Sequence, residues 1–438
     1  MSALYGRAKG FTLIEVMIAV ALGLVLSVGV VSLFGTTSRT NKLQNGLARL
    51  QENGRFAAST MELDLRMAGG QFANNYSGQA MPDTVVPVVR GRTPVVLVDQ
   101  LKWPDPSPGA GDAPLLTMNS IDAGGYPSVA AATKSYPLSP RYFIQGYSCP
   151  TPGSCTPSGL PSGLPPEGTS PGQRLPASDV LTIRYQRGSG WPAAAIGACS
   201  SGATVAIQTS TVPGNDPFNF AAGDLALITD GVNSSILPVA SFSASALTIG
   251  LTLPGVTTQC VNPGNRDQRV FNFTKDFVTV TYFVRLDADP NPDARPNSPT
   301  AAQRVIPVLI RRENGFDNEL VQGVDQLSFV YGVQNSNGTT SFLSAEEIEA
   351  GAIPCVPPPE GVPTEPGCLW RSVRSIEAHL LVNTVDEVFN LETSGHRYRF
   401  MDVEHATTDT GPLPSTLKAG SMLRREFVAF AATRNHNF

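Results

Sequence analysis

The feature of this sequence that most constrains its fold is an apolar run close to the N-terminus. Residues 11–34 read FTLIEVMIAVALGLVLSVGVVSLF, and the polar residues among them are Thr12, Glu15, Ser27 and Ser32. As an α-helix, the run would reach about 36 Å, which is enough to cross a hydrocarbon core of about 30 Å. It is longer than the apolar part of a signal peptide, which has about 7–15 residues. The run therefore predicts one membrane-spanning helix.

Charge around the run predicts its orientation. Arg7 and Lys9 precede it, no acidic residue occurs among the first ten, and no second apolar stretch of comparable length follows. Basic flanks stay on the cytoplasmic side, so the chain after residue 35 should be exported. We expect a single anchor with a large exported body. The net charge of −5 gives no basic field for nucleic acid.

Glu15 is an unusual residue for such a helix. A carboxylate inside a membrane costs about 2.5–3.5 kcal/mol on insertion scales, so such residues usually have a partner or a function. The nearest plausible cation is a free amine at Phe11, either on the same chain or on a neighbouring copy. That amine would exist only if the ten preceding residues were removed.

The segment MSALYGRAKG-FTLIEVMIAVALGLVLS resembles the leader and helix of a type IV prepilin. The resemblance implies that a prepilin peptidase cuts after Gly10 and N-methylates Phe11. It also implies that Glu15 neutralises the Phe11 amine of an adjacent subunit when helices bundle into a filament.

The helix is predicted to continue beyond the membrane. One face is formed by apolar or small residues at spacings of three and four, the period of a helix: Leu43, Leu47, Leu50, Gly54, Ala57, Met61, Leu65 and Ala68. Gly69-Gly70 is a natural stop. Phe56, Leu63 and Met67 fall on the opposite side, so we expect a head to cover the last turns on two faces.

The remainder reads as β structure. Charged residues make up only 15%, and 41 Gly and 37 Pro favour strands and long loops. The predicted strands are 178–186, 203–209, 224–229, 246–253, 277–286, 304–312, 325–333, 372–385 and 424–433. A short helix is predicted at 344–350.

A second resemblance is to PilW-type minor pilins. It rests on ARLQENGRFAASTMELDLRMAGG, ASDVLTIRY, GDLALITD, ELVQGVDQLSFVYGV and MLRREFVAFAATRN. It implies an α+β, pilin-like fold in which a long N-terminal helix packs on an enlarged, mainly antiparallel β head. The expected divisions are a leader (1–10), a membrane half (11–35), an amphipathic half (36–70), an irregular region (71–175) and a β-rich exported head (176–438).

Six cysteines lie in the exported part, at Cys149, Cys155, Cys199, Cys260, Cys355 and Cys368. An even number in an oxidising compartment predicts disulfides, although six cysteines allow fifteen pairings. The local pairings are Cys149–Cys155, Cys199–Cys260 and Cys355–Cys368. No C-x-x-C spacing indicates a metal site.

Other candidate chemistry is weak. Ser170 lies in GTSPG, which matches a nucleophile elbow, but the surrounding LPPEGTSPGQRLP predicts neither a strand nor a helix. The four histidines show no metal-binding spacing. One stretch alternates oxygen ligands as a calcium loop does, at Asp287, Asp289, Asn291 and Asp293. Pro292 and Ser298 depart from that motif, so a solvated acidic turn is the simpler interpretation. We expect no catalytic residue and no cofactor.

The two resemblances together imply a non-enzymatic minor pilin that helps prime pilus assembly near the tip and so serves motility and cell adhesion. Its expected partners are other minor and major pilins, the prepilin peptidase, the inner-membrane pilus assembly machinery and a large tip adhesin. It would cross the inner membrane once, with its head in the periplasm, and then enter the pilus. The alternatives are a type II secretion pseudopilin and a pilin-anchored periplasmic enzyme or ligand-binding domain.

Overall fold

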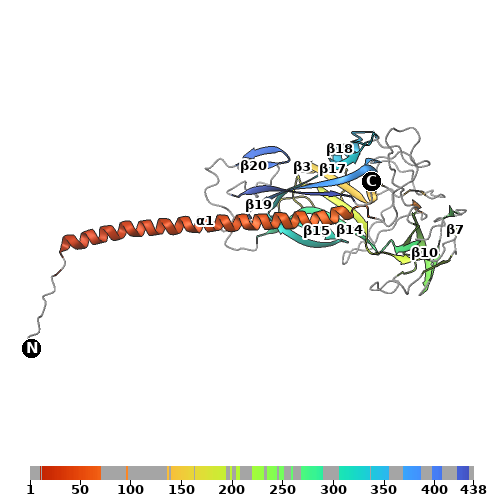
Figure 1. The fold of residues 1–438 in the computed structure, drawn as a ribbon, viewed down its shortest axis with the longest axis horizontal. Coiled ribbons are helices and arrows are strands. Elements are labelled where there is room, and N and C mark those ends of the chain that lie inside the picture. The colour runs from red at the N-terminus through yellow and green to blue at the C-terminus, as the bar shows by residue number, and fades with distance from the viewer. Residues whose placement is uncertain are drawn as a thin grey trace, which may run out of the picture.

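The structure is a computed structural model in which one long helix projects from a β-rich head (Figure 1). It describes residues 10, 12–70, 95–96, 136–137, 140–161, 163–193, 198–199, 204–207, 220–230, 234–243, 246–250, 258–259, 268–289, 305–335, 337–354, 368–385, 397–406 and 422–433. The start of α1 lies at the far end of the helix from the head (Figure 1).

Helix α1 runs without a break over Leu13–Met67, 55 residues. Thr12 caps it through a capping box with Glu15, which satisfies backbone N–H groups that a helix start leaves unpaired. Residues 12–42 are exposed, and the apolar part of this segment is long enough to cross a membrane. At the other end, Gly69 takes a positive φ of 70° that ends the helix.

The second half of α1 packs on the head through one face. Its buried residues are Leu50, Gly54, Ala57, Met61, Asp64 and Leu65. A Cβ at Gly54 would lie 2.3 Å from the ring of Phe427, so glycine allows the head to approach closely here. The expectation of two covered faces is wrong. Phe56 and Leu63 are 53% and 64% exposed, and only Met67 packs against the core from that side.

Two antiparallel sheets enclose the main core with α1. The first has the order β16-β15-β14-β5-β3-β4. Its strands are β3 (Ile144–Thr151), β4 (Ser154–Thr156), β5 (Val180–Gln186), β14 (Phe277–Ala288), β15 (Val305–Glu313) and β16 (Phe316–Gln322). Side chains from its central strands, from α1 and from the second sheet share one apolar cluster.

The second sheet has the order β18-β17-β19-β22. Its strands are β17 (Val324–Gln334), β18 (Thr340–Leu343), β19 (Val373–Asn383) and β22 (Arg424–Ala432). A buried ion pair ties β22 to β17, because the Arg424 guanidinium lies 2.7 Å from the Asp325 carboxylate and both side chains are 1% exposed. Asn383 of β19 donates to the same carboxylate.

A second β lobe is inserted between β5 and β14. These two strands are hydrogen-bonded neighbours, with Gln186 opposite Phe277, although about ninety residues separate them in the chain. The inserted strands are β6 (Trp191–Pro192), β7 (Ala198–Cys199), β8 (Thr204–Ala206), β9 (Leu225–Thr229), β10 (Ser234–Ser243), β11 (Ala246–Ile249), β12 (Thr258–Gln259) and β13 (Arg269–Asn272). The lobe has its own apolar cluster, around Ile228, Leu237 and Val270.

Short elements complete the head. Strands β1 (Val95–Val96) and β2 (Tyr136–Pro137) extend the sheet of the inserted lobe beyond β10. A hairpin, β20 (Arg397–Phe400) and β21 (Val403–Ala406), follows β19. The helix predicted at 344–350 is α3 (Ala345–Ala350), capped by Ser344. The 3-10 helices are η2 (Pro140–Tyr142) and η5 (Cys368–Ser372).

The fold confirms an α+β architecture with a mainly antiparallel head. One boundary needs correction, because β3 and β4 lie in the region 71–175 that was predicted to be irregular. Strand β3 contains a glycine and a proline, which weakened its signal. Gly146 is required by packing, since a Cβ there would lie 1.9 Å from the Tyr331 hydroxyl.

Candidate functional site

The first candidate site is the free end of α1. Gly10 is exposed, and a Cβ built on it would meet no atom within 4 Å. The Glu15 carboxylate accepts from the backbone N–H and the hydroxyl of Thr12, both at 3.4 Å. Phe11 lies outside the described residues, and no ion pair joins Glu15 to any residue within them. Glu15 therefore stands in the first turn of an exposed helix, where a negative charge also complements the helix dipole.

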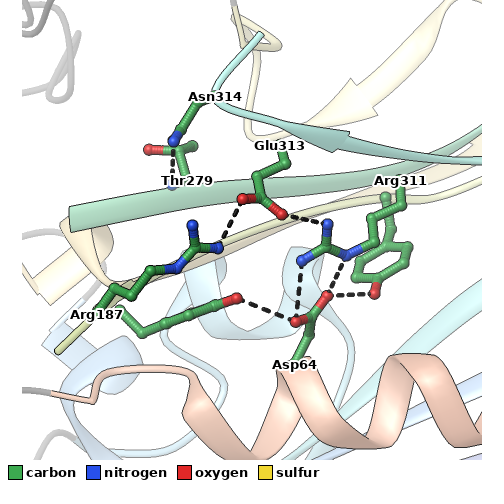
Figure 2. A network of polar contacts seen from close by, with 8 residues as sticks. Asp64, Arg187, Thr279, Arg311, Glu313 and Asn314 are labelled. Carbon is green, nitrogen blue, oxygen red and sulfur yellow. Dashed lines mark hydrogen bonds and ion pairs between the residues drawn. The ribbon is translucent and has the colours of Figure 1, made fainter. Parts of the chain in front are cut away.

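The second candidate site joins the other end of α1 to the head (Figure 2). Asp64 of α1 is buried and faces three adjacent strands of the first sheet. Its carboxylate lies 2.6 Å from Nε of Arg311 on β15 and accepts from the hydroxyl of Tyr282 on β14, also at 2.6 Å. A second Arg311 nitrogen and the hydroxyl of Tyr185 on β5 donate to the other oxygen, each at 3.1 Å. One helical carboxylate thus contacts β5, β14 and β15.

A second layer of charge supports this network. Arg311 also contacts Glu313, and Glu313 accepts from Arg187 at 2.6 Å, which closes a chain of alternating charges (Figure 2). Burial alone would lower the pKa of Arg311, but its hydrogen bonds to Asp64 and Glu313 outweigh burial and raise that pKa above its ordinary value. Burial, and after it the Asp64 charge, raises the pKa of Tyr185 to about 12. Both groups therefore remain donors to Asp64 at physiological pH.

The position of Asp64 explains why it needs such partners. A negative charge near a helix C-terminus interacts unfavourably with the helix dipole, and burying it adds a desolvation cost. Sequence analysis did not single out this residue. A signal was present, because Asp64 follows Met61 by three residues and precedes Ala68 by four, which places it on the buried stripe. We interpret the Asp64 network as the set of polar contacts that fixes the helix to the head.

The local disulfide predicted in the head is confirmed. Cys149 of β3 and Cys155 of β4 are bonded and close the hairpin between these strands. The Asp179 carboxylate accepts from the backbone N–H groups of Cys149 and Phe329, which links the hairpin to the second sheet. Burial raises the pKa of Asp179 to about 6, although these two backbone donors act against it.

Replacing both Cys149 and Cys155 by alanine should lower the free energy of unfolding by about 2 kcal/mol, the chain-entropy value for so short a loop. Non-reducing peptide mapping of the native protein should recover the two cysteines in one linked peptide. Urea unfolding of the double variant measures the energy. Free thiols at both positions in exported protein would contradict the assignment.

The other two cysteine pairings remain predictions. Cys260 and Cys355 lie outside the described residues. Strand β7 nevertheless pairs with β12 so that Cys199 is opposite Thr258, two residues before Cys260.

The acidic stretch proposed as a calcium loop is described only in part. Asp287 lies in β14, and both its oxygens accept from Arg285, at 2.6 and 2.8 Å. Asp289 is buried, whereas Asn291 and Asp293 lie outside the described residues. The described side chains form no group of three or more that could hold a metal ion. Asp287 therefore serves an ion pair on the surface of the first sheet.

The residues weighed for catalysis do not form a site where they are described. Ser170 lies in a turn, and its backbone N–H donates to the side chain of Gln173. His379 of β19 contacts Glu426 at 2.7 Å, and His405 stacks on Tyr398. His396 and His436 lie outside the described residues.

Comparison with known families agrees with both ends of the chain. Residues 6–31 match the prokaryotic N-terminal methylation motif. Residues 282–435 match the family described as type IV pilus-assembly protein W, and this region runs from β14 to just beyond β22. No curated protein and no solved structure matches the chain. By its methylation motif and by the C-terminal part of its head, the chain matches a type IV prepilin of the PilW family.

Proposed function

We propose that this protein is a minor pilin, a non-enzymatic filament subunit that helps prime pilus assembly near the tip. The observation that carries the proposal is the division of α1 into two halves. Residues 12–42 are exposed, and those up to Phe34 are apolar apart from Thr12, Glu15, Ser27 and Ser32, whereas the half after residue 49 is fixed to the head. The prepilin motif and this apolar helix anchor the chain in the inner membrane.

A continuous helix of this kind suits a subunit that leaves the membrane for a filament. Its 55 residues span about 80 Å, so the exposed half can exchange lipid for the helices of neighbouring pilins while the head stays outside. Apolar contacts favour neither the membrane nor the filament strongly, because lipid tails and neighbouring helices are equally apolar. Glu15 can supply the preference, since the processed Phe11 amine of a neighbour would neutralise it only in the assembled state.

The inserted lobe supports a place near the tip. Residues 187–276 add a second β lobe with its own core to the head, between strands that pair directly with each other. Subunits within a helical filament have neighbours above, below and beside them, whereas a terminal subunit has one end free. We therefore assign the chain to the group of minor pilins that starts the filament, with other pilins and the inner-membrane machinery as partners.

The test of this function is Glu15→Val. Valine removes an intramembrane carboxylate, so membrane insertion should be retained or favoured by about 2.5–3.5 kcal/mol. Piliation and co-isolation with other prepilins should fall to the level of a strain that lacks the protein, because the neighbouring amine loses its counter-charge. Pilus counts by electron microscopy and affinity isolation from detergent measure the two effects.

Ser27→Val is the matched control. Ser27 lies in the same apolar half and donates to the Gly23 carbonyl at 2.8 Å, so its replacement also removes a polar group but no charge. It should assemble normally. Normal piliation and co-isolation with Glu15→Val would contradict the proposed role of the carboxylate.

A further inference from the structure

The second sheet presents two end strands, β18 on one side and β22 on the other. An open edge exposes unpaired backbone N–H and C=O groups that can template pairing with another chain. The hairpin reaches only one end of the β22 edge, where the Met401 backbone N–H donates to the Glu426 carboxylate. Beyond Glu426, no described segment pairs with the outer edge of β22.

The pattern of hydrogen bonds between β19 and β22 shows which residues of β22 direct their backbone N–H and C=O groups away from β19. In an antiparallel pair, opposite residues alternate between those that exchange backbone hydrogen bonds and those that do not. Thr433 donates to the Arg374 carbonyl, and Thr384 donates to the Leu423 carbonyl, at the two ends of the β19–β22 ladder. The register between these two ends has no shift, so hydrogen-bonded pairs recur at every second residue. The residues between them therefore point their backbone groups away from β19, and beyond Glu426 these are Val428, Phe430 and Ala432.

The same count applies to β18. Asn335 donates to the Thr339 carbonyl, and the register continues with Val333 opposite Ser341. The backbone groups of Thr340 and Phe342 therefore point away from β17.

These two edges carry apolar side chains on the same face of the sheet. Opposite residues in an antiparallel sheet share a face, and the register connects Phe342 to Gly332, Gly332 to Ser375, and Ser375 to Ala432. Phe430 and Val428 lie two and four residues before Ala432, on that face. Phe342, Phe430 and Val428 are 56%, 52% and 48% exposed. Natural edges are usually protected by charge, proline or bulges, and these three positions have none of these.

We propose that the β22 edge pairs with the β18 edge of a second copy of this chain, so that the sheet continues from one head into the next. Along the sheet each strand runs opposite to its neighbour, so β18 and β22 run in opposite directions. Two copies in the same orientation can thus join β22 to β18 as an antiparallel pair. The contact would bring Phe342 of one copy beside Phe430 or Val428 of the other, on one face.

The membrane anchor selects this arrangement. Both copies carry α1 into the same membrane, and the second sheet lies alongside α1 on the head (Figure 1). A two-fold pairing of β22 with β22 would require the second copy to be turned over, which would point its anchor away from the membrane. Pairing of β22 with β18 keeps both anchors parallel. The inference goes beyond the proposed function and uses only the shared membrane anchor.

The test is disulfide trapping between two copies of the full-length chain in inner membranes. One copy carries Phe342→Cys and one epitope tag, and the other carries Phe430→Cys or Val428→Cys and a second tag. Opposite residues that exchange backbone hydrogen bonds have Cα atoms about 5.5 Å apart, within the range of about 4.4–6.8 Å that a disulfide accepts. Mild oxidation should give a mixed-tag dimer, and the more efficient of the two partners identifies the register.

Two variants make the test specific. Phe316→Cys replaces Phe342→Cys as the control, because Phe316 is similarly exposed (50%) but lies on β16 of the first sheet, and it should give no dimer. Val428→Lys in the copy that carries Phe430→Cys should abolish the dimer at unchanged protein level, since the Val428 side chain is exposed and its backbone N–H and C=O groups point away from β19.

Three outcomes would overturn the proposal. The first is that only monomers form, and the second is that same-tag dimers form through Phe430→Cys, which would indicate a two-fold contact. The third is that the cysteines join a different prepilin, so that this edge serves another partner. Because trapping is measured in membranes without pili, its result is independent of the outcome for Glu15→Val.

Discussion

Replacing Asp64 by alanine should lower the free energy of unfolding of the protein by about 3–5 kcal/mol, the usual cost of removing one partner of a buried ion pair. The variant would leave the Arg311 guanidinium without the carboxylate that accepts from two of its nitrogens, and the hydroxyls of Tyr185 and Tyr282 without their acceptor. Urea unfolding of the detergent-solubilised chain, followed by tryptophan fluorescence, measures the change, because Trp370 lies in the main core.

Glu62→Ala is the matched control for this experiment. Glu62 lies two residues away on the same helix and pairs with Arg66 on the surface, where the two side chains are 37% and 58% exposed. Its loss should change the free energy of unfolding by less than about 1 kcal/mol. Asp64→Leu combined with Arg311→Met should recover part of the stability, since apolar pairs can replace buried ions. Equal effects of Asp64→Ala and Glu62→Ala on the free energy of unfolding would contradict the claim that the Asp64 network fixes α1 to the head.

Much of the fold could be predicted because its signals are local. The helix follows from a continuous apolar run and then a stripe at helical spacing, and its observed end at Met67 lies next to the expected glycine pair. Strands such as β14 and β15 were predicted from their β-branched residues. Strand β10 was missed because Pro238 interrupts it and serines dominate it. Strand β16 was missed because most of its side chains are polar and exposed.

The two candidate sites also differ in whether their signal is local in the sequence. Glu15 could be predicted as functional because its anomaly, a carboxylate within an apolar run, is visible in a few consecutive residues. Asp64 could be recognised only through its partners, and Tyr282 and Arg311 lie 218 and 247 residues away in the chain. Its place on the buried stripe indicates that a partner must exist. Only the packing of α1 against β5, β14 and β15 shows which residues supply it.

Valine at position 10 should leave residues 1–10 attached to nearly every copy of the chain. Cleavage after Gly10 requires a peptidase to bind the residue next to the cut bond, and valine places a branched side chain where glycine has none. The protein itself offers no obstacle, because Gly10 is exposed and a Cβ there meets nothing within 4 Å. Mass spectrometry of the N-terminal peptide should find an intact leader in the variant and a methylated Phe11 in the parent.

Ala8→Val adds similar bulk two residues earlier and should be processed normally. An uncut chain has no free amine at Phe11, so Gly10→Val should also reproduce the assembly defect of Glu15→Val. Gly10→Val and Glu15→Val remove the same proposed ion pair, and effects within one interaction are not additive. The double variant should therefore assemble no worse than either single variant. A mature terminus at Phe11 in the Gly10→Val protein would show that cleavage does not require glycine at position 10. Normal piliation by an uncut chain would show that Glu15 needs no amine.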